Sequence, residues 1–166
     1  MKRRNFLIMG SIVGISPYLQ ADTQNSFNDS FKKVKATIAA VQEHMFPEGS
    51  KIPSAKSMHA TQFLFETIKD VTYDKDIRAF VLEGANELII REKGKFIFMN
   101  QLDKEKALRN YEKTRYGKNW LSRIMTLSME AIFSDPVYGS NINEKGWKAL
   151  NSFGGMPRPK TRYIKL

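Results

Sequence analysis

The sequence contains no cysteine, and this absence excludes several classes of protein at once. Without cysteine the chain can form no disulfide, carry no lipid on cysteine, ligate no iron–sulfur cluster and attach no c-type haem through C-x-x-C-H. Histidine is also scarce, because His44 and His59 are the only two and neither has a spacing typical of a metal site. No G-x-G-x-x-G motif follows a predicted strand, so a dinucleotide-binding fold is unsupported. We therefore expect no catalytic, cofactor-binding or metal-binding residues in this chain itself.

The N-terminus, MKRRNFLIMGSIVGISPYLQA, has the three parts of an export signal: positive residues, an apolar run and a small residue at a cleavage point. The apolar run is about half the ~20 residues that a membrane-spanning helix needs. Arg3 and Arg4 resemble a twin-arginine signal, and Phe6 and Leu7 are the apolar residues that follow such a pair. The alternatives are an ordinary secretory signal and a basic cytoplasmic N-terminus. We predict a twin-arginine-type signal over residues 1–21 and a periplasmic location.

Acidic residues are outnumbered by basic ones, and the formal net charge is +10, of which +7 belongs to residues 22–166. An exported basic chain meets little nucleic acid, so an acidic protein partner or an anionic membrane surface fits better. The C-terminal tail has no acidic residue after Glu144. Its cations indicate either a solvated tail or an electrostatic grip on an acidic partner. These cations are Arg158, Lys160, Arg162 and Lys165.

Apolar residues that recur every three or four positions predict a mainly α-helical, compact single domain over residues 31–166. Residues 22–30 are polar and are predicted to be a linker, with Asp29 or Ser30 capping the first helix. The domain should hold about five helices, at residues 31–45, 55–71, 76–91, 103–114 and about 118–134.

Gly84 and residues 96–102 depart from the pattern of regular helices. Gly84 interrupts the apolar pattern of the third helix, and glycine costs about 1 kcal/mol in a helix interior. Residues 96–102 have no partner strand, and a lone strand is not stable. We expect this segment to be an extended connector that inserts Phe96, Phe98 and Leu102 between the helices, with Asp103 capping the helix that follows.

The stretch DPVYGSNINEKGW, residues 135–147, opens an irregular C-terminal segment that begins at about residue 134. Asp135 and Pro136 end the last helix, because a residue before proline is pushed out of the α region. The glycines permit positive φ, and asparagine can close side-chain turns onto the backbone. The aromatic residues Tyr138 and Trp147 are then free to fold back as apolar groups with polar tips. The segment either seals the helical core or forms a contact surface.

This stretch resembles the C-terminal signature of the gluconate 2-dehydrogenase subunit 3 family, which is approximately Asp-Pro-x-Tyr-Gly-Gly-Asn, a short gap and Gly-Trp. Ser140 replaces the second glycine of the family pattern. Upstream, Trp120 with Leu121 and the segment around His44 also fit the layout of the family. The positions that match, and that we consider as partner-facing candidates, are Asp135, Pro136, Tyr138, Gly139, Asn141, Gly146 and Trp147.

The resemblance implies a small, non-catalytic subunit of a periplasmic, membrane-associated sugar-acid dehydrogenase. In such complexes a large flavoprotein subunit holds FAD, and a cytochrome c subunit with haem c passes on electrons where it is present. The small subunit carries the signal for the twin-arginine translocase and escorts the flavoprotein during export. The alternative from a different class is a free-standing exported helical binding protein without a dehydrogenase partner. On either interpretation His44 and His59 are packed or surface histidines.

Overall fold

The computed structural model of the chain describes residues 17–138 and 140–161, with side chains from residue 26 onward. Within these residues the regular structure is entirely helical and contains no strand, which confirms the predicted mainly α fold. The α-helices are α1 (Pro17–Met45), α2 (Ala60–Lys69), α3 (Lys75–Arg91), α4 (Gln101–Glu112), α5 (Arg115–Phe133) and α6 (Lys145–Ala149). Short 3-10 turns lie between them: η3 (Phe96–Phe98), η4 (Pro136–Tyr138) and η5 (Ile142–Glu144).

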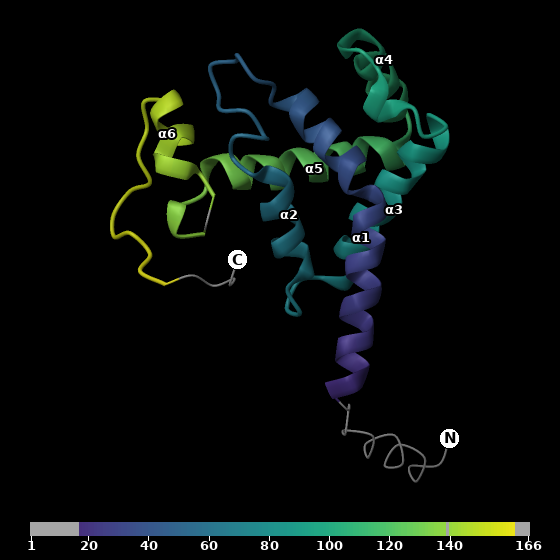
Figure 1. Cartoon of the computed structure of the whole chain (residues 1–166). Helices are drawn as coiled ribbons and strands as arrows, with labels where there is room; N and C mark the ends of the chain where they lie inside the picture. The colour runs from purple at the N-terminus through teal and green to yellow at the C-terminus, as the bar shows by residue number, and fades with distance from the viewer. Residues whose placement is uncertain (1–16, 139, 162–166) are drawn as a thin grey trace, which may run out of the picture.

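Helix α5 is the centre of the domain, because it contacts each of the other α-helices of the described chain. Figure 1 shows α5 crossing the molecule, with α1 leading in from the N-terminal end and α6 at the far end of α5. Its apolar face explains this position: Trp120, Ile124, Leu127, Ala131 and Ile132 recur at helical spacing, and each is 1% exposed or less. A helix with such a continuous apolar stripe is stable only when other helices cover it.

The first helix is longer than the sequence predicted. We expected a linker at residues 22–30 and a helix from Phe31, whereas α1 begins at Pro17 and runs through that segment. The physical reason is Phe27, which lies one turn before Phe31 and extends the same apolar face. Phe27 is buried and stacks on Phe65 of α2, with ring centroids 5.9 Å apart. The segment is polar in composition, but this one aromatic contact ties it to the core.

Two other helices also begin at different residues than predicted. Helix α4 begins at Gln101 because the Asn100 side chain accepts a hydrogen bond from the Asp103 backbone N–H at 2.9 Å. Asp103 is therefore not the cap but the third residue of the helix, where it bonds back to the Asn100 amide. Helix α2 begins at Ala60 instead of residue 55, after a loop that buries Met58.

Gly84, which the sequence suggested would destabilise the third helix, is required in α3 for close packing. It is buried in α3, and a Cβ at this position would overlap the indole ring of Trp120. The Trp120 Nε1–H donates to the Val81 carbonyl at 3.0 Å, and the Tyr111 hydroxyl donates to the Gly84 carbonyl at 3.1 Å. Burial raises the pKa of Tyr111 above its usual range. The missing side chain therefore lets three helices meet around one tryptophan.

The connector before α4 is only partly as predicted. Phe96 is 1% exposed and inserts into the core as expected. Phe98 and Leu102 do not, because they are 83% and 75% exposed. Residues 96–98 form the tight turn η3 instead of an extended strand, and with about three residues per turn only one of the two rings can face inward.

A second, smaller apolar cluster lies where the C-terminal segment meets the domain. It joins the end of α1, the loop before α2 and the end of α5, through Phe46, Ala55, Met58, Ala60, Ala131 and Ile132. Near it, the Gln42 amide donates to the Ser128 hydroxyl at 3.0 Å and accepts from the Thr61 hydroxyl at 2.7 Å. These bonds satisfy a fully buried amide and link α1, α2 and α5.

Candidate functional site

The residues of the predicted signature converge on the C-terminus of α5. The last carbonyls of an α-helix have no partner inside the helix, so a buried helix end needs groups from elsewhere. Here the Asn141 backbone N–H donates to the Ala131 carbonyl at 3.0 Å. The Trp147 Nε1–H donates to the Phe133 carbonyl at 2.7 Å, and the Asn141 amide donates to the Ser134 carbonyl at 2.9 Å. The segment thus turns back and completes the helix that precedes it.

Asn141 stabilises the turn by which this segment comes back to the end of α5. It is fully buried and adopts a left-handed conformation with φ of 51°, which asparagine tolerates better than most residues. Its side-chain oxygen accepts from the Gly146 backbone N–H at 2.8 Å, which confirms the predicted asparagine turn. Gly146 does not adopt positive φ, contrary to our prediction. It lies in α6, where a Cβ would overlap the Ile132 carbonyl, so it is needed for close approach.

Trp147 holds the rest of the described C-terminal segment in place through packing and hydrogen bonding. Its ring lies against Gly154, where a Cβ would overlap the indole, and the Arg158 guanidinium lies 4.7 Å from the ring centroid. The Ser152 backbone N–H donates to the Trp147 carbonyl at 2.9 Å. Residues 147–158 therefore form a loop that closes on one side chain; we call it the Trp147 loop.

Arg158 and Asp135 close the same loop from the other side. The Arg158 Nε–H donates to Asp135 Oδ2 at 2.6 Å, and a second guanidinium nitrogen lies 3.2 Å from Glu144 Oε1. The hydrogen bond from Arg158, and next the one from the Val137 backbone N–H, hold the pKa of Asp135 below its usual range. Arg158 was one of four tail cations considered for gripping a partner. It instead neutralises carboxylates of its own chain, because folding back brings Asp135 and Glu144 to it.

The other predicted positions are placed as follows. Pro136 and Tyr138 lie half-buried in η4. Ser140, which replaces a family glycine, is 2% exposed, and its hydroxyl donates to the Met58 carbonyl at 3.0 Å, so the substitution adds a bond to the loop before α2. Gly139 and the signal residues Arg3, Arg4, Phe6 and Leu7 lie outside the described residues.

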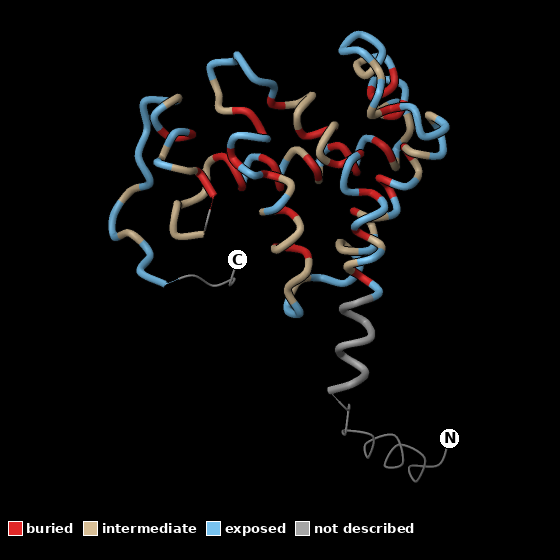
Figure 2. Tube along the Cα trace, viewed as in Figure 1, coloured by how far each residue is buried: buried red, intermediate tan, exposed pale blue. Residues whose placement is uncertain are grey.

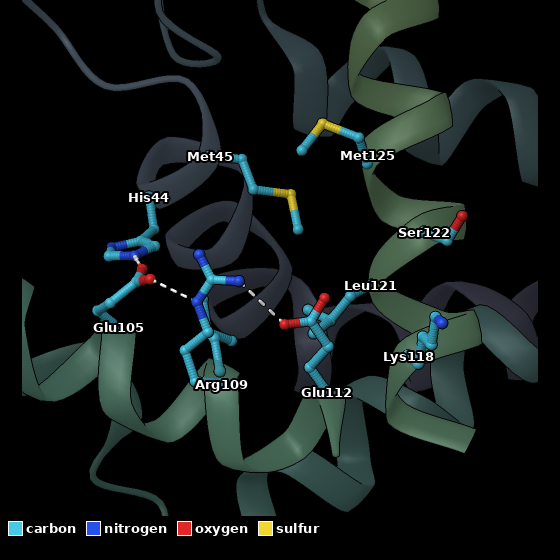
Figure 3. Close-up of a pocket in the computed structure, with 10 residues that line it drawn as sticks. His44, Met45, Glu105, Arg109, Glu112, Lys118, Leu121, Ser122 and Met125 are labelled. Carbon is cyan, nitrogen blue, oxygen red and sulfur yellow. Dashed lines mark hydrogen bonds and ion pairs between the residues drawn. The ribbon is translucent and has the colours of Figure 1, made fainter. Parts of the chain in front are cut away.

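A separate cleft of about 490 Å³ lies at the other end of α5, between α1, α4 and α5 (Figure 3). Its apolar lining includes the flexible side chains of Met45 and Met125, with charged groups along α4 on one side. The lining residues are His44, Met45, Glu105, Leu108, Arg109, Glu112, Lys118, Leu121, Ser122 and Met125.

His44 and the charged groups of α4 in this cleft bond to one another. His44 is bonded through Nδ1 to Gln101 at 2.8 Å and through Nε2 to Glu105 at 2.7 Å, so it links α1 to α4. Arg109 in turn binds Glu105 at 2.7 Å and Glu112 at 3.1 Å. The hydrogen bond from His44, and next the one from Arg109, lower the pKa of Glu105. His44 thus has polar partners that sequence spacing did not reveal, and it packs between helices.

The second histidine, His59, is exposed and stands before α2 in a left-handed conformation with φ of 49°. It lies in the loop before α2 and does not line the cleft around His44. No group of three or more potential metal ligands occurs within residues 17–138 and 140–161. Across those same residues, no helix combines the length and apolar character needed to cross a membrane.

Comparison with known proteins gives one result for the whole domain. The family model described as "Gluconate 2-dehydrogenase subunit 3" matches residues 32–155, from the second residue of the predicted domain to the Trp147 loop. No curated protein and no solved structure matches the chain. The matched range takes in the helices α2 to α6 and about the C-terminal half of α1.

Proposed function

Because the chain belongs to the gluconate 2-dehydrogenase subunit 3 family, we propose that it is the non-catalytic small subunit of a periplasmic gluconate 2-dehydrogenase-like complex. The family match over residues 32–155 is the observation that carries this proposal. In the proposed complex a large subunit holds FAD and oxidises the substrate, and a cytochrome c subunit can accept the electrons. The small subunit binds the large one and escorts it through twin-arginine export.

The local geometry supports an accessory role. Asn141 and Trp147 of the signature complete the end of α5, and Asp135 binds Arg158. In the cleft, Glu105 binds both His44 and Arg109. Groups held in this way fix the shape of the domain and position its surface. A rigid surface reduces the entropy that association costs, which suits a subunit whose task is binding.

The subunit assignment is tested by purifying a tagged full-length chain from periplasm. We expect a flavin-containing protein in constant molar ratio with the chain, measured by flavin absorbance against chain concentration. Recovery of the chain alone, as a monomer, would contradict the accessory role and favour the alternative of a free-standing exported binding protein.

The escort role is tested at the two arginines. We predict that Arg3→Lys with Arg4→Lys leaves both the chain and the flavoprotein in the cytoplasm, because a receptor that reads the arginine pair is not satisfied by charge alone. The measurement is the distribution of flavin absorbance between cytoplasm and periplasm. Lys32→Arg with Lys33→Arg, an exposed basic pair on α1, is the matched control and should leave export unchanged. Export of the flavoprotein by the double arginine variant would remove the escort role but not the subunit assignment.

A further inference from the structure

The Trp147 loop presents apolar side chains outward although it is held firmly from within. Leu150, Phe153 and Met156 are 52%, 79% and 85% exposed. Figure 2 shows this last part of the described chain mostly as exposed, beyond the buried end of α5. Isolated apolar residues on a surface are ordinary, but three within seven residues of one loop form a continuous candidate for contact with another molecule.

The loop is fixed in place, so this exposure is a property of its conformation. Trp147 anchors it through Gly154 and the Phe133 carbonyl, and Arg158 anchors its far end through Asp135. The exposed side chains are therefore carried on a backbone whose entropy has already been lost, and this favours tight binding.

The charge around the loop indicates what kind of surface it meets. Residues 145–166 contain six lysine or arginine residues and no aspartate or glutamate. Of the cations in the described part, Arg158 is neutralised within the chain, whereas Lys145, Lys148 and Lys160 are exposed. An apolar centre with a basic rim is complementary to an apolar patch with an acidic rim.

We propose that Leu150, Phe153 and Met156 are the surface by which this subunit docks onto an acid-rimmed apolar patch of the large, flavin-containing subunit. This proposal rests on the proposed function and adds the contact surface to it. A second copy of the chain is a poor occupant, because two basic rims would repel each other. A lipid surface suits the loop less well, because its irregular backbone beyond Ser152 would leave polar groups without partners in an apolar phase.

The test is the double substitution Phe153→Ser with Met156→Ser in the tagged full-length chain. We expect the retained flavin per mole of chain to fall at least about tenfold, since central apolar anchors dominate interface energy. The matched control is Phe98→Ser with Leu102→Ser, a pair of equal exposure located at η3 and α4. The control should retain flavin as the unchanged chain does. Circular dichroism should show the same unfolding transition for both variants, because all four side chains are exposed.

Two other readouts sharpen the result. Retention of the flavoprotein should weaken as the salt concentration rises from about 0.05 to about 0.5 M. The Debye length then shrinks from about 14 Å to about 4 Å, so the charges of the basic rim are screened. Lys148→Glu with Lys160→Glu should weaken retention of the flavoprotein at low salt and remove most of the dependence of retention on salt.

Each remaining outcome is decisive. If the unchanged chain retains no flavoprotein, the proposed function fails and this inference fails with it. If the Phe153/Met156 variant and the Phe98/Leu102 variant both retain the flavoprotein as the unchanged chain does, or both lose it, the docking surface is wrong while the subunit assignment stands. Binding to phosphatidylglycerol vesicles that only the Phe153/Met156 variant loses would assign the loop to the membrane instead. A dimer in sedimentation that this variant abolishes would assign it to self-association, and would equally overturn the proposal.

Discussion

The two tryptophans of the chain sit in the same kind of contact in two different regions. Trp120 lies against Gly84 and donates its indole N–H to the Val81 carbonyl. Trp147 lies against Gly154 and donates its indole N–H to the Phe133 carbonyl. The first joins α3 and α5 inside the domain, with 0% of the side chain exposed, and the second joins a loop to the end of α5, with 8% exposed.

The comparison teaches that one contact type can serve two purposes. Around Trp120 the partners described above belong to the helices α3 and α4, so the contact is part of the cooperative core. Around Trp147 the neighbours are the end of one helix and an irregular segment, so the contact fixes a surface. Free energy of local opening varies across a protein, and the Trp147 loop should open at lower cost than the core.

Replacing each tryptophan by alanine should separate the two regions, and this is the largest effect that we predict. Trp120→Ala should lower the free energy of unfolding by about 3–5 kcal/mol, because it leaves a cavity between helices. Trp147→Ala should lower the free energy of unfolding by roughly 2 kcal/mol or less, because only the Trp147 loop is released. Trypsin should then cleave after Lys148 and Lys160 much faster than in the unchanged chain. Urea unfolding followed by circular dichroism and timed proteolysis measure the two effects. Equal losses of global stability would show that the segment belongs to the core.

The next effect concerns the turn that brings Trp147 to α5. Asn141→Ala should cost about 2–4 kcal/mol, because the buried Gly146 N–H and Ser134 carbonyl lose their partner and alanine tolerates positive φ poorly. Asn151→Ala is the matched control, because Asn151 has the same φ of 51° but is exposed. It should cost only about 1 kcal/mol. Urea unfolding measures both, and equal values would reduce the role of Asn141 to its backbone conformation.

The smallest effect is a response to acid that only one tryptophan should report. The pKa of Asp135 is lowered in the folded chain, so its contribution to holding the Trp147 loop is complete above the unfolded value of about 3.9 and is lost as the pH falls through the folded pKa. Below about pH 4 the indole N–H of Trp147 should therefore exchange faster in NMR spectra. The indole of Trp120 is the internal control. Asp135→Asn should remove this response, and a parallel change at both indoles would indicate general acid unfolding.

The helices were predictable from the sequence because each carries a periodic apolar face. In the helix predicted at residues 31–45, Phe31, Val34, Ile38 and Val41 recur every three or four positions, and all four are buried. The start of α1 was missed because a single aromatic, Phe27, outweighs the polar composition around it. The exposure of Phe98 and Leu102 was not predicted, because apolar character alone does not show which residues of a tight turn, or of the first turn of a helix, face inward.

The candidate site was predictable in its residues but not in its contacts. Asparagine in DPVYGSNINEKGW correctly indicated a turn, whereas Gly146 lies in α6 and does not adopt the positive φ that we predicted. The pairing of Asp135 with Arg158 joins residues 23 positions apart, and that of His44 with Glu105 joins residues 61 positions apart. Neither spacing follows from a helical or strand period, so only the folded arrangement of the helices brings these groups together.

The capping of α5 by Asn141 and Trp147 has a consequence for biosynthesis. The helix that contacts each of the other described α-helices is completed by residues that follow it in the chain. During synthesis these residues leave the ribosome after α5, and until then the Ala131 and Phe133 carbonyls can bond only to water. A chain cut between Ser134 and Asn141 would therefore keep α1 to α5 but leave the end of α5 without these partners.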